Sequence, residues 1–207
     1  MFRGKSQHRA AAPVRRAERS RVLRIIGGSW RGRKLRFPAS PAIRPTPDRV
    51  RETLFNWLGG ATPGAQCLDL FAGSGALGLE ALSRGAAHVT FVEQDAAAVR
   101  ELRARLDEWH ASDARVERAD ALRYLAGAAR PFDIVFLDPP FASGLLTRAA
   151  TLLEQHHWLR AGTLIYVESA AREPLPALPG SWRVLKAKQA GEVGYHLFVT
   201  QSLAPDA

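Results

Sequence analysis

The stretch Leu68-Asp69-Leu70-Phe71-Ala72-Gly73-Ser74-Gly75-Ala76-Leu77-Gly78 indicates the fold, because its glycines join an apolar β-like run to a helical pattern. Without a Cβ, glycine lets the backbone turn sharply and approach a ligand closely. Asp69 precedes the glycines, and Glu93 lies 24 residues after it, at the end of the next apolar run. A carboxylate beside the loop repels a pyrophosphate but can receive a cationic amino-acid group, and Glu93 suits a ribose diol. The two carboxylates favour S-adenosylmethionine over NAD, although the glycine spacing alone fits either cofactor. A turn without a ligand is disfavoured, because glycines are unfavourable at the start of a helix.

Short β runs alternate with helical stretches from Gln66 onward, which is the pattern of parallel βα units. The expected strands are Cys67–Phe71, His88–Val92, Arg115–Arg118, Phe132–Leu137 and Thr163–Glu168. The expected helices are Ala76–Arg84, Ala96–Trp109, Ala121–Gly127 and Leu145–His157. An antiparallel hairpin is expected to follow, formed by Trp182–Lys188 and Tyr195–Gln201. The sequence therefore predicts an α/β fold in which a parallel sheet receives an antiparallel final strand.

Length and composition exclude several classes of protein. With 207 residues, 46% of them hydrophobic, the chain is long enough for one ordinary domain with a real core. Its one cysteine, Cys67, cannot form an internal disulfide and is expected in the core, and its six histidines show no metal-ligand spacing, so no metal is expected. No run approaches the ~20 apolar residues of a membrane span, so we expect a cytoplasmic protein that does not contact a membrane.

Positive charge is concentrated near the N-terminus. Residues 1–51 hold 15 of the 29 Lys and Arg but only two acidic residues, whereas the rest of the chain is slightly acidic. We expect residues 1–20 to be a disordered basic arm, residues 21–45 a basic β-hairpin extension, and residues 46–207 the main domain. A localised block of this kind favours a polyanion partner, and the alternative is a solvated tail that aids solubility.

The hairpin segment combines cations with an aromatic ring. Its candidate nucleic-acid-binding side chains surround Trp30, itself a candidate to stack on an unpaired base, and they are Arg31, Arg33, Lys34 and Arg36. Thr46 is then expected to be the N-cap of a helix that has Pro47 at its first position. Arg44, Arg49 and Arg51 flank this helix start, where they either line the same cleft or are solvated.

A second chemical signal is Asp138-Pro139-Pro140-Phe141, directly after an apolar strand. The prolines fix the backbone and remove N–H donors, so the carbonyls near Asp138 and Pro139 can act as rigid acceptors. An exocyclic amine on a base needs such acceptors for its hydrogens and an aromatic ring for stacking, which Phe141 provides. Asp120, after the third strand, can accept from an adenine amino group and is equally suited to be a helix N-cap. These residues alone are compatible with transfer of a methyl group to adenine N6, to cytosine N4 or to a protein glutamine amide.

Taken together, the stretches resemble the RsmD-type methyltransferases, which act on a guanine N2 of bacterial small-subunit ribosomal RNA. The resemblance runs from Leu23 to Phe198. Its blocks are Arg24-Ile25-Ile26-Gly27-Gly28, Arg31-Gly32-Arg33-Lys34-Leu35, Arg44-Pro45-Thr46, Asp48 to Leu58, Cys67 to Ala81, Asp138-Pro139-Pro140-Phe141 and Leu164 to Ser169. The Arg-rich blocks are more particular to this family than the glycine loop, which many methyltransferases share.

The resemblance implies a class I methyltransferase (Rossmann-like) fold, with a seven-stranded, mostly parallel sheet, helices on both faces and an N-terminal β-hairpin. It implies transfer of a methyl group from S-adenosylmethionine to N2 of guanine-966 in 16S rRNA, within the small ribosomal subunit or its assembly intermediate. We expect the protein to act as a monomer. The implied mechanism is direct in-line attack without a covalent enzyme intermediate. The alternative hypotheses are that the protein is an NAD(P)-dependent oxidoreductase, an adenine-N6 or other exocyclic-amine methyltransferase, or an RNA-binding assembly factor without catalytic activity.

The resemblance also implies residue roles. The implied catalytic residues around the target base are Asp138, Pro139, Pro140 and Phe141. The implied cofactor-binding residues are Asp69, Phe71, Gly73 and Gly75 at the methionine part, Glu93 at the ribose and Asp120 at the adenine. The chain departs from some relatives at Ala119-Asp120-Ala121, where those have an Asn-containing stretch.

Overall fold

The structure is a computed structural model that describes residues 20–38, 46–141 and 143–201. The expected arm at residues 1–20 lies outside this part of the chain except for Ser20. The helices are α1 (Asp48–Leu58), α2 (Ala76–Ser83), α3 (Ala96–Glu108), α4 (Ala121–Leu125) and α5 (Leu145–Gln155), with a short 3-10 turn at Gly59–Ala61. The strands are β1 (Ser20–Arg24), β2 (Lys34–Pro38), β3 (Gln66–Asp69), β4 (His88–Glu93), β5 (Ala114–Arg118), β6 (Ile134–Leu137), β7 (Leu164–Ala170), β8 (Trp182–Ala190) and β9 (Val193–Thr200).

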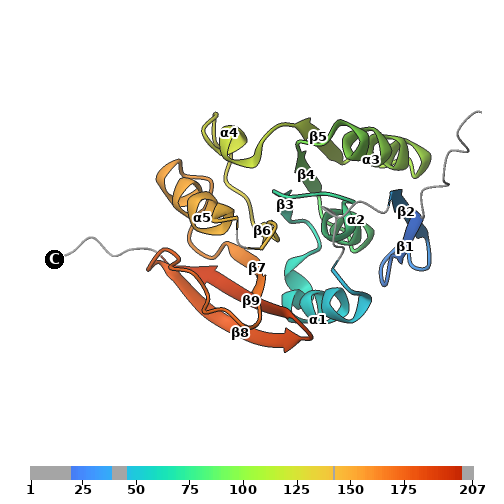
Figure 1. Ribbon diagram of the computed structural model, residues 1–207. Coiled ribbons are helices and arrows are strands. Elements are labelled where there is room, and N and C mark those ends of the chain that lie inside the picture. The colour runs from blue at the N-terminus through green and yellow to red at the C-terminus, as the bar shows by residue number, and fades with distance from the viewer. Residues whose placement is uncertain (1–19, 39–45, 142, 202–207) are drawn as a thin grey trace, which may run out of the picture.

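Seven of these strands form one sheet in the order β5-β4-β3-β6-β7-β9-β8 (Figure 1). Neighbouring strands from β5 to β7 are parallel, while β9 pairs antiparallel with both β7 and β8. The order in which the chain adds strands to the sheet reverses at β3. The chain first moves outward to β4 and β5 and then returns to place β6 on the other side of β3. The predicted α/β fold, with a seven-stranded, mostly parallel sheet and an antiparallel final strand, is confirmed.

Apolar residues on both faces of the sheet build two clusters. One cluster joins the sheet to α1, α2 and α3, and the other joins it to α4 and α5. All four residues of β6 are buried because helices cover it on both sides, as expected for a central parallel strand. Cys67 is fully buried in β3, which confirms its core position. None of the helices in the described ranges has the length and apolar character of a membrane span.

The hairpin of β1 and β2 is attached to α2. Leu23, Ile25 and Leu35 are buried in the same cluster as α1 and α2. The carboxylate of Glu80 accepts the backbone N–H groups of Ile26 and Gly27, at 2.9 and 2.8 Å. These contacts make the hairpin an integral part of the core.

A close backbone approach fixes the hairpin turn on α2. Gly28 has a φ of +76°, and a Cβ at this position would lie 1.8 Å from the carbonyl oxygen of Ser83. The adjacent Ser29 N–H donates to that same carbonyl at 2.7 Å. Only glycine allows this approach, since a Cβ would overlap the carbonyl.

Two expectations near α1 are wrong. Pro47, not Thr46, occupies the N-cap, and it makes no side-chain cap bond. The Thr46 hydroxyl instead donates to the buried carboxylate of Glu168 at 2.6 Å, because that carboxylate needs donors inside the protein. Arg51 neither lines the cleft nor is solvated: it is fully buried and donates to Glu80, Asp48 and a backbone carbonyl.

Candidate active site

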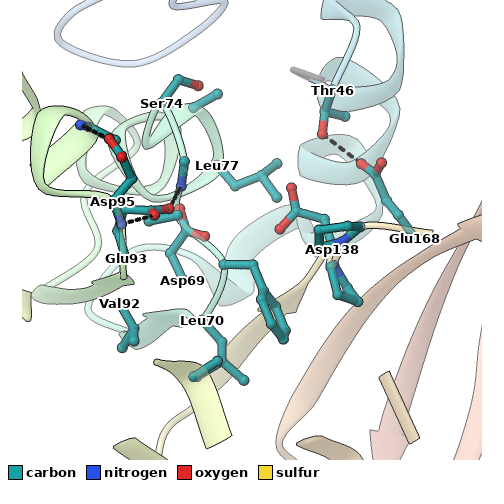
Figure 2. Close-up of a pocket in the computed structure, with 18 of the residues that line it drawn as sticks. Thr46, Asp69, Leu70, Ser74, Leu77, Val92, Glu93, Asp95, Asp138 and Glu168 are labelled. Atoms are coloured by element: carbon teal, nitrogen blue, oxygen red, sulfur yellow. Dashed lines mark hydrogen bonds between the residues drawn. The ribbon is translucent and has the colours of Figure 1, made fainter. Parts of the chain in front are cut away.

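A cavity of about 1240 Å³ opens where β3, β4 and β6 end, beside the point at which the strand order reverses (Figure 2). Open parallel sheets bind ligands at this position, because the loops after neighbouring strands diverge there. The sequence-predicted residues that line the cavity are Asp69, Phe71, Gly73, Glu93, Asp120, Asp138, Pro139, Pro140 and Phe141. The fold therefore brings almost all of the expected cofactor and target-base residues into one space.

Gly75 is the exception among the expected cofactor residues, since it does not line this cavity. It precedes α2 in a left-handed conformation, with a φ of 75°. A Cβ here would lie 2.6 Å from the Cδ1 atom of Leu102 on α3. Gly75 thus shapes the turn that presents the loop, because only glycine combines this φ with so close a neighbour.

Asp69 ends β3 with its side chain almost wholly buried. One carboxylate oxygen accepts the Gly78 N–H at 2.9 Å, which holds the side chain against the start of α2. Burial raises the pKa of Asp69 to about 7, the Gly78 hydrogen bond opposes this rise, and the nearby charge of Glu93 adds to it. A carboxylate in this state gains strongly from a cation, since a cation offsets the cost of its buried charge.

Glu93 ends β4 on the other side of the loop. Its two carboxylate oxygens accept the N–H groups of Gly73 and Asp95, at 2.8 and 2.7 Å. These bonds fix the orientation of the carboxylate while it still lines the cavity. An acceptor fixed in this way suits the two hydroxyls of a ribose.

Asp120 has the helix-capping role that the sequence allowed. Its Oδ1 accepts the N–H groups of Leu122 and Arg123, both at 3.0 Å, at the start of α4. It also lines the cavity, so capping and contact with a ligand are compatible here.

Asp138 follows β6 and lines the cavity. Its Oδ1 is shielded from solvent and has no hydrogen-bond partner among the described residues. Burial raises the pKa of Asp138 well above its usual range, and the charges of Glu168, Asp69 and Glu93 raise it further. An unpaired buried acceptor is costly, so its place beside the cavity indicates a donor supplied by a ligand.

The three residues after Asp138 differ in their surroundings. Pro139 is buried, Pro140 is exposed, and Phe141 is partly exposed beside the cavity. The Pro140 carbonyl accepts the Ser143 hydroxyl at 2.6 Å, which fixes the turn after the prolines.

Sequence reasoning assigned no role to Glu168, near the end of β7, or to Tyr166, and it expected Thr46 to be a helix N-cap. Thr46 and Tyr166 both donate to its Oε1, at 2.6 and 2.8 Å. Glu168 lies at the cavity and acts electrostatically on Asp138 (Figure 2). The signal available was an acidic residue at the end of an apolar strand, the same pattern as Asp69 and Glu93.

The expected nucleic-acid-binding cations lie apart from the cavity. Arg31, Arg33, Lys34 and Arg49 are exposed, and none of them lines it. Arg44 and the side chain of Arg36 lie outside the described residues. These four exposed side chains therefore do not belong to the cavity.

Trp30 does not present a free ring. It is only partly exposed and packs on Trp109 with ring centroids 5.1 Å apart. The Arg33 guanidinium lies over the Trp109 ring, 5.3 Å from its centroid. The ring of Trp30 thus contributes to packing between the hairpin and α3, which the sequence did not predict.

Known proteins resemble the chain over most of its length. A family model described as conserved hypothetical protein 95 matches residues 23–199. The Ribosomal RNA small subunit methyltransferase D of Escherichia coli K12 is 53% identical over 176 residues, which cover 85% of this chain and 89% of that protein. Its namesake in Haemophilus influenzae is 46% identical over 180 residues, covering 85% and 93%.

Solved structures agree with this match. A methyltransferase from Escherichia coli superposes with a TM-score of 0.79 at 50% identity, covering 87% of this chain and 98% of that one. The T. thermophilus 16S rRNA N2 G1207 methyltransferase RsmC, solved with AdoMet and guanosine, gives a TM-score of 0.62 at 27% identity, covering 92% and 52%. By sequence and by fold, the chain therefore belongs to the RsmD-type family of class I methyltransferases.

Proposed function

We propose that this protein transfers a methyl group from S-adenosylmethionine to the exocyclic N2 of a guanine in 16S rRNA, at the site named guanine-966 in its family. S-adenosylmethionine is the methyl donor of the family, and the names of the relatives give ribosomal RNA as their substrate class. The observation that carries the proposal is the buried Oδ1 of Asp138, which follows β6 beside the cavity and has no hydrogen-bond partner in the part of the chain that the structure describes. An exocyclic amine of a base carries N–H groups, so it supplies the kind of hydrogen-bond donor that such a buried acceptor needs.

The residues of the cavity fit the charge of the donor molecule. When bound, S-adenosylmethionine supplies an electrophilic methyl group on a sulfonium sulfur. Asp69 receives the ammonium of its methionine part, Glu93 accepts the ribose hydroxyls, and Asp120 accepts from the adenine amine. The carboxylates also make the cavity favourable for a molecule that carries two positive charges.

Asp138 and the residues after it act on the base. The N2 lone pair of guanine is delocalised into the ring, so the amine is a weak nucleophile until acceptors hold its hydrogens. Asp138 and the Pro139 carbonyl supply those acceptors, and Phe141 stacks on the extruded base. As N2 bonds to the methyl carbon, the carbon–sulfur electron pair goes to sulfur, and Asp138 takes the proton that N2 loses.

Labelled methyl transfer tests the reaction directly. Small subunits from a strain that lacks the enzyme should accept label from S-adenosylmethionine, and nucleoside analysis should recover it as N2-methylguanosine. Label in another nucleoside, or none on subunits or on naked rRNA despite cofactor binding, would contradict the guanine-N2 proposal.

Cofactor affinity should depend on the ionisation of Asp69. The pKa of Asp69 is about 7 in the free protein, and only the ionised carboxylate attracts the methionine ammonium. Affinity should therefore fall as the pH drops through about 7, approaching a tenfold loss per unit below it. Calorimetric titration at pH 6, 7 and 8 measures this slope. Asp69→Asn should bind more weakly at pH 8 and show a flatter profile, and equal slopes for both proteins would refute the role of Asp69.

The exposed cations of the hairpin should bind rRNA phosphates. Arg31→Gln with Lys34→Gln should weaken small-subunit binding and lower the salt slope of log Kd by about 2, one for each lost phosphate contact. Cofactor affinity should not change, because both side chains lie apart from the cavity. The matched control is Arg130→Gln with Arg148→Gln, which removes two exposed charges near α4 and α5. An unchanged slope in the hairpin variant would exclude these phosphate contacts.

Deleting residues 1–36 is a poorer version of this experiment. The deletion would remove Leu23, Ile25 and Leu35 from the core and would leave the carboxylate of Glu80 without two of its backbone donors. A loss of RNA binding in that deletion would therefore not distinguish unfolding of the protein from the loss of a phosphate contact.

A further inference from the structure

The charged residues of the outermost strand on one side of the sheet are all cations. β8 forms this edge, and its nine residues include Arg183, Lys186 and Lys188 but no acidic residue. All three side chains are exposed, and none of them forms an ion pair within the described part of the chain. Exposed cations of this kind are accessible to an anionic partner.

Lys186 and Lys188 lie on the face of the sheet that α1 covers. In the antiparallel pair of β8 and β9, Lys186 is opposite Leu197 and Lys188 is opposite Tyr195. Directly opposite residues on neighbouring strands point to the same face. Leu197 and Tyr195 are buried in the cluster that also contains α1 and the hairpin, and the ring of Trp57 on α1 stacks on Tyr195 with centroids 5.2 Å apart. Figure 1 shows α1 between the end of β8 and the hairpin, so the two lysines and the hairpin flank the same helix.

The two lysines continue the line of β8 away from the cavity. The turn between β8 and β9, from Ala190 to Val193, forms part of the cavity wall. Lys188 precedes Ala190 by two residues and Lys186 precedes it by four. At about 3.4 Å per residue, the Cα atoms of the lysines are about 7 and 14 Å from that of Ala190. A strand of nucleic acid that leaves the cavity over this turn would therefore pass both lysines.

The cavity itself repels the backbone of a nucleic acid. Most charged side chains on its wall are acidic, and Arg105 is the one cation there among the described residues. A target nucleotide that enters the cavity brings a phosphate on each side of it, and carboxylates repel those phosphates. Cations beside the cavity are therefore needed to hold the backbone.

We propose that Lys186 and Lys188 bind phosphates of the rRNA strand next to the target nucleotide, as a second RNA contact besides the hairpin. This inference rests on the proposed methylation of rRNA and adds a surface that positions the substrate. Phosphate contacts fix the position of the RNA without selecting its sequence. Lysines on an edge strand also hinder pairing with a second sheet, so the experiment has to separate the two roles.

Removal of both charges tests the contact. Lys186→Gln with Lys188→Gln should lower the salt slope of log Kd for small subunits by about 2, one for each lost phosphate contact. The KM for subunits should rise, whereas kcat and S-adenosylmethionine affinity should stay within about twofold, since neither lysine lines the cavity. Arg130→Gln with Arg148→Gln is the matched control, because it removes the same charge from another exposed surface and should retain the wild-type slope.

Charge reversal separates RNA contact from protection of the edge strand. Lys186→Glu with Lys188→Glu keeps two charges on β8, so it still hinders sheet pairing, but it repels phosphates. This variant should remain as monodisperse as the wild type in light scattering and should bind small subunits more weakly than the glutamine variant. Binding equal to that of the wild type would show that the lysines act only at the edge, and the inference would be wrong.

The wild-type protein provides a test that does not depend on the folding of a variant. Bound small subunits should slow acetylation of Lys186 and Lys188 by an amine-specific reagent, as measured by mass spectrometry. Equal acetylation rates with and without saturating subunits would overturn the inference.

Failure of this inference is distinguishable from failure of the proposed function. If the wild type produces N2-methylguanosine but the glutamine variant keeps the wild-type salt slope, the inference is wrong and the proposed function stands. If the wild type produces no N2-methylguanosine but the glutamine variant loses about 2 in slope, the proposed function is wrong and the phosphate contact is supported.

Discussion

Asp138→Ala is expected to lower methyl transfer to small subunits by at least about 100-fold, the lower end of what a positioned proton acceptor contributes. The substitution removes the acceptor whose Oδ1 has no partner within the described residues, and with it the group that localises the N2 lone pair. S-adenosylmethionine affinity should stay within about threefold, because Asp69 and Glu93 are unchanged. Single-turnover transfer and calorimetric binding separate the two effects.

Two further variants make the Asp138 result specific. Asp138→Asn keeps the size of the side chain and an acceptor oxygen but cannot take a proton, so its activity should also be severely reduced. Asp113→Asn, a substitution of an exposed aspartate that does not line the cavity, should retain wild-type transfer. Wild-type turnover in Asp138→Ala would exclude the assigned role.

Loss of Asp138 should also change stability with a definite sign. Burial raises the pKa of this carboxyl in the folded state, so folding is favoured at low pH and loses stability as the pH rises from the unfolded value of about 4 through the folded one. Asp138→Asn removes that loss. Without cofactor, its melting temperature should exceed that of the wild type at pH 8 and approach it near pH 4. A variant that is less stable at pH 8 would contradict this.

The main parts of the cavity could be predicted because their residues are close in sequence to recognisable strand ends. Asp69 and Glu93 flank the glycine loop, and Asp138 follows the apolar run of β6, so the parallel pattern alone brings them to one edge of the sheet. The same reasoning gave the antiparallel final strand, because the last two β runs are separated by a short turn.

The roles of Arg51 and Thr46 could not be predicted from local patterns. Arg51 resembles any helix-surface cation in sequence, yet its nearest buried partner, Glu80, is 29 residues away. Thr46 has the sequence features of an N-cap, but its hydroxyl bonds a carboxylate 122 residues further along the chain. Such contacts depend on which elements pack together, and helix or strand periodicity contains no information about them.

The buried carboxylate of Glu80 should be the most important single side chain for holding the hairpin. It is 0% exposed and accepts the N–H groups of Ile26 and Gly27 as well as donors from Arg51 and Arg84. Glu80→Ala leaves the fully buried Arg51 guanidinium without one of its two carboxylates, and it leaves two backbone donors unpaired. Removing one partner of a buried ion pair costs about 3–5 kcal/mol, so the free energy of unfolding should fall by that amount.

Urea unfolding measures the loss, and hydrogen exchange locates it. The amides of Ile26 and Gly27 should exchange faster in Glu80→Ala than in the wild type, because their acceptor is gone. The matched control is Glu108→Ala, which breaks an exposed ion pair with Arg105 and should cost less than about 1 kcal/mol. Equal stability losses in the two variants would show that Glu80 is no more important than a surface carboxylate. If the larger loss is found, small-subunit binding should weaken in Glu80→Ala at temperatures where it still binds S-adenosylmethionine, because the hairpin that carries Arg31, Arg33 and Lys34 is no longer fixed on α2.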